Sequence, residues 1–285
     1  MTKPLILFFP QYQAGVMPSI IPNGAKALRA LWKNAPDFVE VPVEDSDASD
    51  KQTVRGVNYR KILIRQLNAA IDIMNREDPD FVLTTGGDCG ASFAPIAYIN
   101  RKYSGKIGVL WIDAHADIHV PSTSPSGNYH GMIVRHLMGH AEFDIKPPLP
   151  LKPHQIGYLG LRDAEAEEHA VIADLNIPHF SSEEVMKSDA PLDAVIAHFK
   201  KSGITHLYLH VDCDVMDSKA FPHVDVPEPN GLTLERLLEI LQNLRGRMPV
   251  AGCCLTEYAP HEPGAGMDIM RRIYTEGLGV ALPKA

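Results

Sequence analysis

The chain has little of what marks several large protein classes. Its 285 residues include only four cysteines and two tryptophans, and aromatic residues make up 7% of it. It contains no internal repeat, no low-complexity segment and no apolar run long enough to span a bilayer. The formal net charge is −8 and basic residues form no run, which argues against a surface for nucleic acid or anionic lipid. We therefore expect neither nucleic acid nor a membrane as a partner.

The cysteines do not form the spacing pattern of a disulfide framework. Cys253 and Cys254 are adjacent in an apolar segment, so in a strand they face opposite sides of the sheet. Cys213 lies between two acidic residues, and Cys89 follows a Gly-Gly-Asp turn. Residues 1–13 contain only a short apolar stretch and no evident small-residue cleavage site. These features favour reduced thiols and a cytoplasmic protein.

Strand-like and helix-like segments alternate along the chain, whose apolar content of 45% and charged content of 22% are ordinary for a globular protein. The expected strands cover residues 5–9, 38–43, 81–84, 107–112, 155–158, 206–211 and 250–255. Expected helices include residues 25–32, 60–75, 192–201 and 234–244. This alternation predicts an α/β fold with three layers, α/β/α, around a mostly parallel central sheet. We expect residues 1–285 to form a single domain with one large core.

Two acidic segments directly follow apolar, strand-like runs. Residues 113–117 (DAHAD) follow the run 106–112, and residues 212–214 (DCD) follow the run 205–211. In an extended chain alternate residues project to the same side, so the acidic side chains of each segment converge if the backbone stays extended. Carboxylates and an imidazole at strand ends suit Mn²⁺, and also Fe, Co, Ni or Zn. Either segment alone would also fit a solvated turn, but the pair predicts a metal-dependent hydrolase.

Short motifs occur in this chain in the order found in the ureohydrolases, the arginase, agmatinase and formiminoglutamase superfamily, which it resembles. The matching segments span most of the chain and are residues 23–29 (NGAKALR), 86–89 (GGDC), 113–117 (DAHAD), 126–131 (SGNYHG), 160–163 (GLRD), 212–217 (DCDVMD) and 256–257 (TE). The resemblance implies an arginase-like fold and a single ureohydrolase-type catalytic domain. It also implies a homo-oligomer, since such proteins are commonly trimers or hexamers.

The resemblance further implies a binuclear metal centre with two Mn²⁺ per subunit. The implied metal ligands are Cys89, Asp113, His115, Asp117, Asp212 and Asp214. Asp113 and Asp212 match the carboxylates that bridge the ions; Cys89 and Asp117 complete one ion's ligands, and His115 and Asp214 the other's. A hydroxide between the ions attacks the guanidinium carbon, because the metals lower the pKa of the bound water.

Two residues of this region depart from the family pattern. Cys89 stands where a histidine ligand is usual; a thiolate is softer than the donors Mn²⁺ prefers and makes the cluster one charge more negative. A divalent metal other than Mn²⁺ therefore stays open. His210 replaces a small residue two positions before Asp212, and strand alternation points it to the same side as Asp212 and Asp214. It is either a partner of the ligands or a packed core histidine.

Two further matches concern the reaction itself. Glu257 matches the carboxylate that binds the guanidinium group through paired hydrogen bonds. His130 matches the mobile histidine proposed to carry a proton to the leaving amine. In another context such a loop histidine would be a surface or capping residue, and the surrounding SGNYHG motif favours the catalytic interpretation.

Substrate recognition is implied at four more positions. Ser126 and Asn128 match residues that bind the α-carboxylate of the amino acid in arginases, although their composition equally fits a tight turn. His119 stands where the family usually has an asparagine with the same task. Glu165 stands where arginases carry an aspartate that recognises the α-amino group. These matches favour an arginine-like amino acid over agmatine, which has no α-carboxylate.

The motifs together predict an amidinohydrolase of arginine metabolism that converts a small guanidino amino acid to urea and ornithine. Because of Cys89, an alternative is an Nω-hydroxy-L-arginine amidinohydrolase that releases hydroxyurea and ornithine. Further alternatives are a formiminoglutamase, an agmatinase or a guanidinobutyrase. A catalytically silent binding homologue is disfavoured, since the retained acidic side chains would destabilise the fold without a compensating charge.

Overall fold

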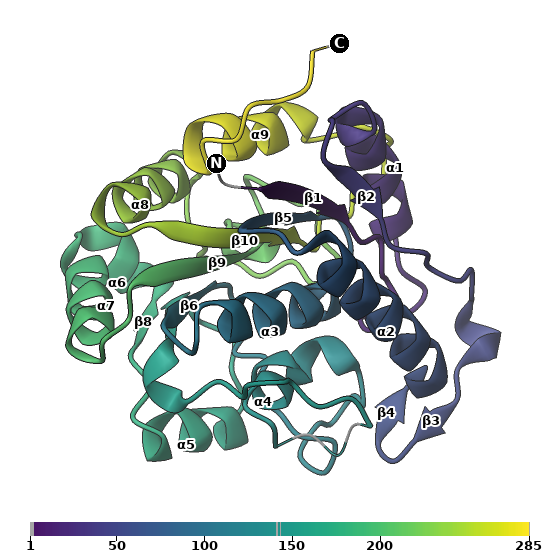
Figure 1. Cartoon of the computed structure of the whole chain (residues 1–285), viewed down its shortest axis with the longest axis horizontal. Coiled ribbons are helices and arrows are strands. Elements are labelled where there is room, and N and C mark those ends of the chain that lie inside the picture. Colours follow the sequence, from purple (N-terminus) through teal and green to yellow (C-terminus); the bar gives the residue numbers. More distant parts are fainter. Residues whose placement is uncertain (1–2, 141, 143, 285) are drawn as a thin grey trace.

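The computed structural model describes residues 3–140, 142 and 144–284, and it shows an eight-stranded sheet between two layers of helices (Figure 1). The strands of this sheet are β1 (Pro4–Phe8), β2 (Phe38–Glu40), β5 (Phe81–Thr85), β6 (Ile107–Ile112), β7 (Ile156–Gly160), β8 (His179–Ser181), β9 (His206–Asp212) and β10 (Val250–Thr256). Their order is β2-β1-β5-β10-β9-β6-β7-β8, and every pairing recorded in it is parallel. The predicted three-layer α/β/α fold is confirmed. A short antiparallel hairpin, β3 (Thr53–Val54) and β4 (Val57–Asn58), lies outside this sheet.

Two apolar cores separate the sheet from its helices. The core on one face packs against α2 (Arg60–Glu77), α3 (Phe93–Lys102), α4 (Ile133–Leu137) and α5 (Ala166–Asp174). The core on the other face packs against α1 (Ile21–Trp32), α6 (Ser182–Lys187), α7 (Ala190–Lys201), α8 (Leu234–Arg247) and α9 (Met267–Arg272). Within the described residues, no helix is long and apolar enough to cross a membrane.

The sequence patterns explain most of these elements. β6 (IGVLWI) is buried along its whole length, as expected of a central parallel strand covered on both faces. α8 buries Leu237, Leu241 and Leu244 on one face, and Thr233 caps it by accepting a hydrogen bond from the Arg236 N–H at 3.2 Å. α3 was not among the expected helices, and its residues from Phe93 to Asn100 are all buried.

Some expected boundaries were wrong. The strand expected over residues 38–43 ends at Glu40, and the strand expected over 155–158 runs from Ile156 to Gly160. Expected helix starts at residues 25 and 192 lie within helices that begin at Ile21 and Ala190, each with a proline in its first turn. β8, an edge strand of three residues, was not expected. None of these differences touches the centre of the sheet.

The four central strands bring distant parts of the sequence to one edge. β5, β10, β9 and β6 are neighbours, and Thr85, Leu255, Val211 and Ile112 form one row across them. The segments that follow this row therefore emerge side by side at the carboxyl edge, where ligands bind in open α/β sheets. β10, the last strand in the sequence, lies between β5 and β9.

The cysteines confirm the expected strand alternation. Cys253 belongs to the core on the α8 side of the sheet and Cys254 to the core on the α3 side. Cys213 also packs on the α8 side, with its Sγ 3.9 Å from the Met270 sulfur. All four cysteines are buried free thiols.

Candidate metal centre

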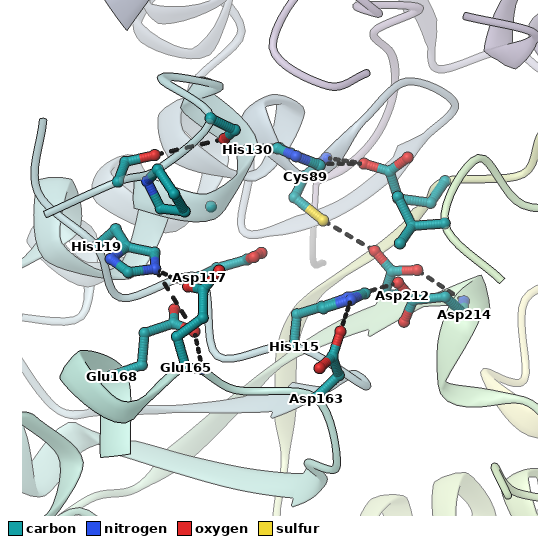
Figure 2. A pocket seen from close by; sticks show the side chains of 16 residues that line it. Cys89, His115, Asp117, His119, His130, Asp163, Glu165, Glu168, Asp212 and Asp214 are labelled. Atoms are coloured by element: carbon teal, nitrogen blue, oxygen red, sulfur yellow. Dashed lines mark hydrogen bonds and ion pairs between the residues drawn. The ribbon is translucent and has the colours of Figure 1, made fainter. Parts of the chain in front are cut away.

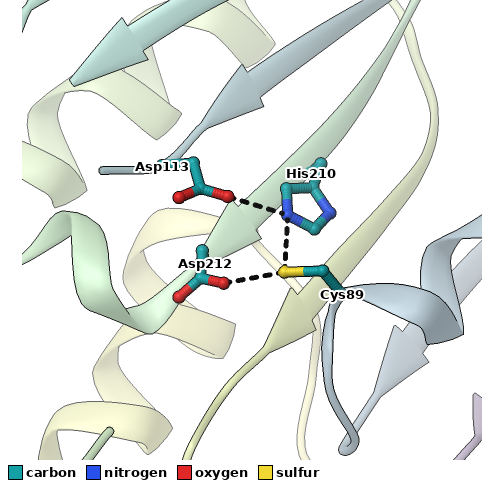
Figure 3. Close-up of side chains that lie close together, drawn as sticks. All are labelled: Cys89, Asp113, His210 and Asp212. Carbon is teal, nitrogen blue, oxygen red and sulfur yellow. Dashed lines mark hydrogen bonds and ion pairs between the residues drawn. The ribbon is translucent and has the colours of Figure 1, made fainter. Parts of the chain in front are cut away.

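Four side chains meet at the carboxyl edge of the central strands and are called the inner group here: Cys89, Asp113, His210 and Asp212 (Figure 3). One potential ligand atom from each lies within 4.8 Å of the other three. The Cys89 thiol donates a hydrogen bond to Asp212 Oδ2 at 2.9 Å. Its sulfur lies 3.7 Å from His210 Nε2, which in turn lies 3.5 Å from Asp113 Oδ2. All four residues are buried.

A second set, the outer group, consists of Asp113, His115 and Asp214 and shares Asp113 with the inner group. His115 Nδ1 lies 2.9 Å from Asp214 Oδ2 and 3.6 Å from Asp113 Oδ1. The other ring nitrogen of His115 lies 3.4 Å from the half-exposed Asp163, which comes from the loop after β7 (Figure 2). The outer group opens onto a pocket of about 210 Å³ through His115 and Asp214, and the inner group reaches the same pocket through Cys89 and Asp212.

The loop after β5 holds Cys89 in place. Gly87 has a φ of +85°, and a Cβ there would lie 2.3 Å from the Phe9 carbonyl oxygen, so the turn requires glycine. The buried Asp88 accepts hydrogen bonds from the Ala14 N–H at 2.8 Å and the Gly90 N–H at 2.9 Å. Burial and the charge of Glu257 raise the pKa of Asp88 to about 7. Asp88 thus stabilises the turn, as its position in the motif predicts.

The segment 113–117 does not stay extended, so the expectation from strand alternation fails there. β6 ends at Ile112, and Asp117 has a φ of +50°. Asp113 Oδ1 accepts a hydrogen bond from the His115 N–H at 2.6 Å, which closes a turn. Asp113 and His115 remain together, whereas Asp117 lines the pocket but belongs to neither group. A similar turn follows β9, where Asp212 Oδ1 accepts from the Asp214 N–H at 2.7 Å.

The electrostatics of the site show a surplus of negative charge. Burial, and then repulsion by Asp214, raises the pKa of Asp212 well above its usual range, and burial with the charge of Asp113 raises that of Asp117. Burial and the nearby Asp212 raise the pKa of the Cys89 thiol. Burial and repulsion by Asp113 raise the pKa of Asp214 to about 6. The anionic forms of Asp117, Asp212 and Asp214 are therefore disfavoured without an added positive charge. At Asp113 burial is outweighed by hydrogen bonds and charge from His115 and His210, and its pKa is lowered.

The donor atoms fit a divalent cation. Asp113 Oδ2 and Asp117 Oδ2 are buried and accept no hydrogen bond from the described residues. Buried carboxylate oxygens rarely lack partners, and a metal ion is a common reason when they do. Oxygen and imidazole donors suit Mn²⁺, whereas the thiol of the inner group adds a donor that suits Zn²⁺, Co²⁺ or Fe²⁺. The residues thus fit two divalent ions, one per group.

His130 and Glu257 both line the same pocket. Glu257 directly follows β10 and accepts a hydrogen bond from the Cys89 N–H at 3.0 Å through Oε1. The same oxygen lies 3.5 Å from His130 Nδ1. Burial lowers the pKa of His130, but the hydrogen bond and charge of Glu257 outweigh it, and the net shift is upward. His130 is therefore able to carry a proton near neutral pH.

His119 and Glu165 also meet, at the far side of the pocket. His119 Nε2 forms a close ion pair with Glu165 Oε2, and its Nδ1 lies 3.0 Å from the Thr123 hydroxyl. Glu168, which the sequence motifs did not single out, lies 3.8 Å from His119 Nε2 and accepts from the Ile118 N–H at 3.1 Å. Its position three residues after Glu165, in a capping box at the start of α5, was a readable signal.

Of the two predicted substrate-binding residues Ser126 and Asn128, only Ser126 lines the pocket. Ser126 lines the pocket and accepts a hydrogen bond from the Asn128 N–H at 3.1 Å. The side-chain oxygen of Asn128 instead accepts from Asn58 Nδ2 at 2.8 Å, and Asn128 is not a lining residue. The buried Asn58 also donates to the Ser126 carbonyl at 3.0 Å. Asn58, from the short hairpin, thus positions the loop that carries Ser126 and Asn128.

Arg162 fixes the loops on the opposite side of the outer group. Its guanidinium donates to the carbonyl oxygens of Asp214 at 2.6 Å, Glu228 at 3.1 Å and Pro229 at 2.9 Å. The segment 212–215 and the loop after it are therefore held to the end of β7. Arg162, the arginine of the GLRD motif, thus holds these loops together through backbone carbonyl oxygens.

Comparisons with known proteins agree with this architecture. The model of the arginase family matches residues 17–270. The arginase of Neurospora crassa is 32% identical over 208 residues, covering 68% of this chain and 56% of that protein. The arginase of Saccharomyces cerevisiae is 36% identical over 177 residues, covering 58% of this chain and 52% of that protein. The chain spans about half the length of these curated relatives.

Solved structures show the same fold. The arginase of Entamoeba histolytica, crystallised with L-ornithine, has a TM-score of 0.82 at 22% identity and covers 96% of this chain and 97% of its own. The proclavaminate amidino hydrolase of Streptomyces clavuligerus has a TM-score of 0.68 at 16% identity, with coverage of 95% and 88%. At such identities the likeness concerns the fold.

Proposed function

Because this chain belongs to the arginase family, we propose that it is a binuclear-metal amidinohydrolase acting on an arginine-like amino acid and releasing urea and ornithine. The observation that carries the proposal is the pairing of His130 and Glu257 above two groups of metal-type donors in one pocket. We further propose two Mn²⁺ or similar divalent ions per subunit, a cytoplasmic homo-oligomer and a role in arginine metabolism.

The residues divide the work along the pocket. When bound, the metal centre supplies a water-derived nucleophile near neutral pH. Glu257 accepts the guanidinium N–H groups and so holds the carbon to be attacked over the donors of both groups. His130 donates its proton to the departing amine nitrogen as the C–N bond breaks. His119, Ser126, Asn128 and Glu165 hold the α-amino and α-carboxylate end of the substrate, with Asn128 acting through its loop.

The test is ornithine release by the Mn²⁺-loaded protein from L-arginine and Nω-hydroxy-L-arginine, measured side by side. Glu257→Gln is the matched variant, because it keeps the side-chain size and removes the charge that binds the guanidinium. We expect kcat/KM for the preferred substrate to fall at least roughly 100-fold in this variant, as for other lost transition-state contacts. No ornithine from either substrate, in protein that holds two ions, would remove this proposal and leave agmatine, guanidinobutyrate or formiminoglutamate to be tested.

Cys89 favours a second candidate, hydrolysis of Nω-hydroxy-L-arginine to hydroxyurea and ornithine. A hydroxyguanidine is less basic than a guanidinium, and so it fits a cluster with weaker Lewis acidity. Replacing Cys89 by His then raises the activity on arginine relative to the hydroxylated substrate. An unchanged ratio of the two kcat/KM values means that Cys89 does not select the substrate.

A further inference from the structure

His210 lies in the middle of β9, fully buried, in a row with Trp111 of β6 and Cys254 of β10. It and Cys89 are the two departures from the ureohydrolase pattern in this region, and the structure brings them into contact at 3.7 Å. Building on the proposed function, we propose that His210 Nε2 is a ligand of the metal ion on the Cys89 side. It supplies from β9 the imidazole that position 89 lacks.

The inner group has the dimensions of one coordination sphere (Figure 3). Donor atoms bound to one ion at about 2.0–2.3 Å lie roughly 3–4 Å from one another. His210 Nε2 lies 3.7 Å from the Cys89 sulfur and 3.5 Å from Asp113 Oδ2, and all four donors fall within 4.8 Å. An ion bound there takes the place of the thiol hydrogen that now points to Asp212, and that proton leaves to solvent.

Hydrogen bonding fixes which ring nitrogen faces the group. The Ser92 hydroxyl donates its single hydrogen to the Cys254 sulfur at 3.0 Å. His210 Nδ1 lies 2.8 Å from the same hydroxyl oxygen and must therefore be the donor of that hydrogen bond. The neutral ring then carries its lone pair on Nε2, toward Cys89 and Asp113. A ligating histidine commonly has its second nitrogen bonded in this way.

Packing fixes the ring plane as well. The His210 ring stacks on Trp111 with centroids 3.5 Å apart and an angle of 9° between the planes. A rotation that would turn Nε2 away from Asp113 is blocked by the indole on one side and by the Ser92 bond at the other end. The imidazole is thus presented in one orientation before any ion binds, which lowers the entropic cost of binding.

A purely structural histidine does not account for the neighbouring atoms. Asp113 Oδ2 is buried, accepts no hydrogen bond within the described residues, and lies next to a ring nitrogen whose lone pair also faces it. Two unshared electron pairs directed at each other are repulsive, and either a proton or a metal ion between them removes the repulsion. One ion bound by the inner group removes this repulsion.

The resulting donor set differs from the one implied by the resemblance. Sulfur, one imidazole nitrogen and two carboxylate oxygens replace sulfur and three carboxylates, because His210 belongs to the inner group and Asp117 lies outside it. This softer set favours Zn²⁺, Co²⁺ or Fe²⁺ over Mn²⁺ at the inner position. The oxygen-rich outer group keeps His115 as its own imidazole, so each ion has one.

The first test uses the unaltered protein. A crystal structure of the Co²⁺-loaded protein, with the ions located by anomalous scattering, is expected to show His210 Nε2 about 2.0–2.2 Å from the ion that also binds Cys89. An inner ion bound by Cys89 but with Nε2 beyond hydrogen-bond distance overturns the proposal. This measurement does not depend on the folding of any variant.

The second test follows the thiolate-to-Co²⁺ charge-transfer absorption during titration of variants. His210→Asn is expected to weaken the inner site by more than the roughly 10–100-fold typical of an outer-shell partner. His136→Asn is the matched control, since His136 is an equally buried imidazole stacked on Phe93 and is not a member of either group. The exchange variant Cys89→His with His210→Ser restores a histidine at position 89 and should regain two bound ions, without the thiolate absorption.

The outcomes separate this proposal from the proposed function. Full affinity in His210→Asn, or an equal loss in His136→Asn, assigns His210 to packing whatever the enzyme hydrolyses. Two ions with His210 bound, and no hydrolysis of any guanidino or formimino substrate, overturn the function and leave the ligand assignment standing.

Discussion

The inner and outer groups share Asp113 but differ in access to solvent. His210 has no exposed surface, and the inner group reaches the pocket only through Cys89 and Asp212. The His115 side chain of the outer group is 24% exposed, and its partner Asp163 is 57% exposed. One half of the centre is therefore enclosed by the sheet and α3, while the other faces the pocket.

The two imidazoles also differ in charge. Burial lowers the pKa of His210, and the neighbouring Asp113 does not reverse the shift. Burial also opposes protonation of His115, but Asp214 and Asp113 outweigh it and raise its pKa. The neutral ring is ready to bind an ion, whereas His115 must first lose a proton. Two histidines of the same site thus have opposite pKa shifts, because His210 is fully buried and His115 lies beside Asp113 and Asp214.

The largest expected effect comes from breaking both groups at their shared residue. Asp113→Asn keeps the side-chain size and replaces a bridging carboxylate, so both ions should be lost and hydrolysis should fall well beyond roughly 100-fold. Metal content measured by inductively coupled plasma mass spectrometry checks this. Asp163→Asn is the control, because it alters the partner of His115 and should cost no more than the roughly 10–100-fold in affinity typical of an outer-shell partner. Retention of two ions in Asp113→Asn would contradict the shared role.

A smaller effect separates the groups. His115→Gln removes the imidazole of the outer group alone, so we expect one Co²⁺ per chain and an intact thiolate charge-transfer absorption. His210→Asn should give the reverse, with the outer ion retained and the absorption weakened. Titration of both variants with Co²⁺ distinguishes them. If His115→Gln abolishes the absorption, the two groups are not separate sites.

The smallest effect concerns the pH dependence of stability, at a histidine on the α3 face of the sheet that belongs to neither group. Burial lowers the pKa of His136 to about 3, against about 6.5 in an unfolded chain. Between these values the unfolded chain binds a proton that the folded chain does not. The free energy of unfolding therefore falls as the pH falls, by about 1.4 kcal/mol per pH unit from this residue, and is unaffected above about pH 6.5.

His136→Asn should remove that contribution. Urea unfolding of metal-free wild type and variant at several pH values between 4 and 8 gives the difference in slope, and groups common to both proteins cancel. Parallel curves would show that His136 does not stay neutral in the folded chain.

The sequence predicted the layers and the edge of the sheet at which the site lies, because buried parallel strands read as apolar runs followed by polar residues. β6 and β9 were predicted almost to the residue for this reason. Asp113 and Asp212 lie close together because β6 pairs with β9, and the local sequence pattern does not predict which strands pair. Glu257 also follows an apolar run and fits the same pattern, whereas only the resemblance indicated Cys89 as a partner.

Finer geometry depended on tertiary contacts. Asp117 does not point to the same side as Asp113 and His115, because the chain turns sharply after β6. The positive φ of Asp117 could not be predicted from its residue type. Asn128 bonds to Asn58, a residue from a hairpin about seventy positions earlier. Strand alternation correctly placed His210 on the same side of β9 as Asp212. Its contact with Cys89 could not be predicted, because it depends on the conformation of the loop after β5.

The central place of β10 has a consequence for how the protein is made. β5 and β9 both pair with β10, which is synthesised after the other strands of the sheet, so each has one unpaired edge until β10 forms. The carboxylate of Glu257 arrives with that same strand. A chain in which β10 has not yet paired is therefore prone to association through the unpaired edges of β5 and β9. We expect chaperones to bind such chains more than chains in which β10 has paired.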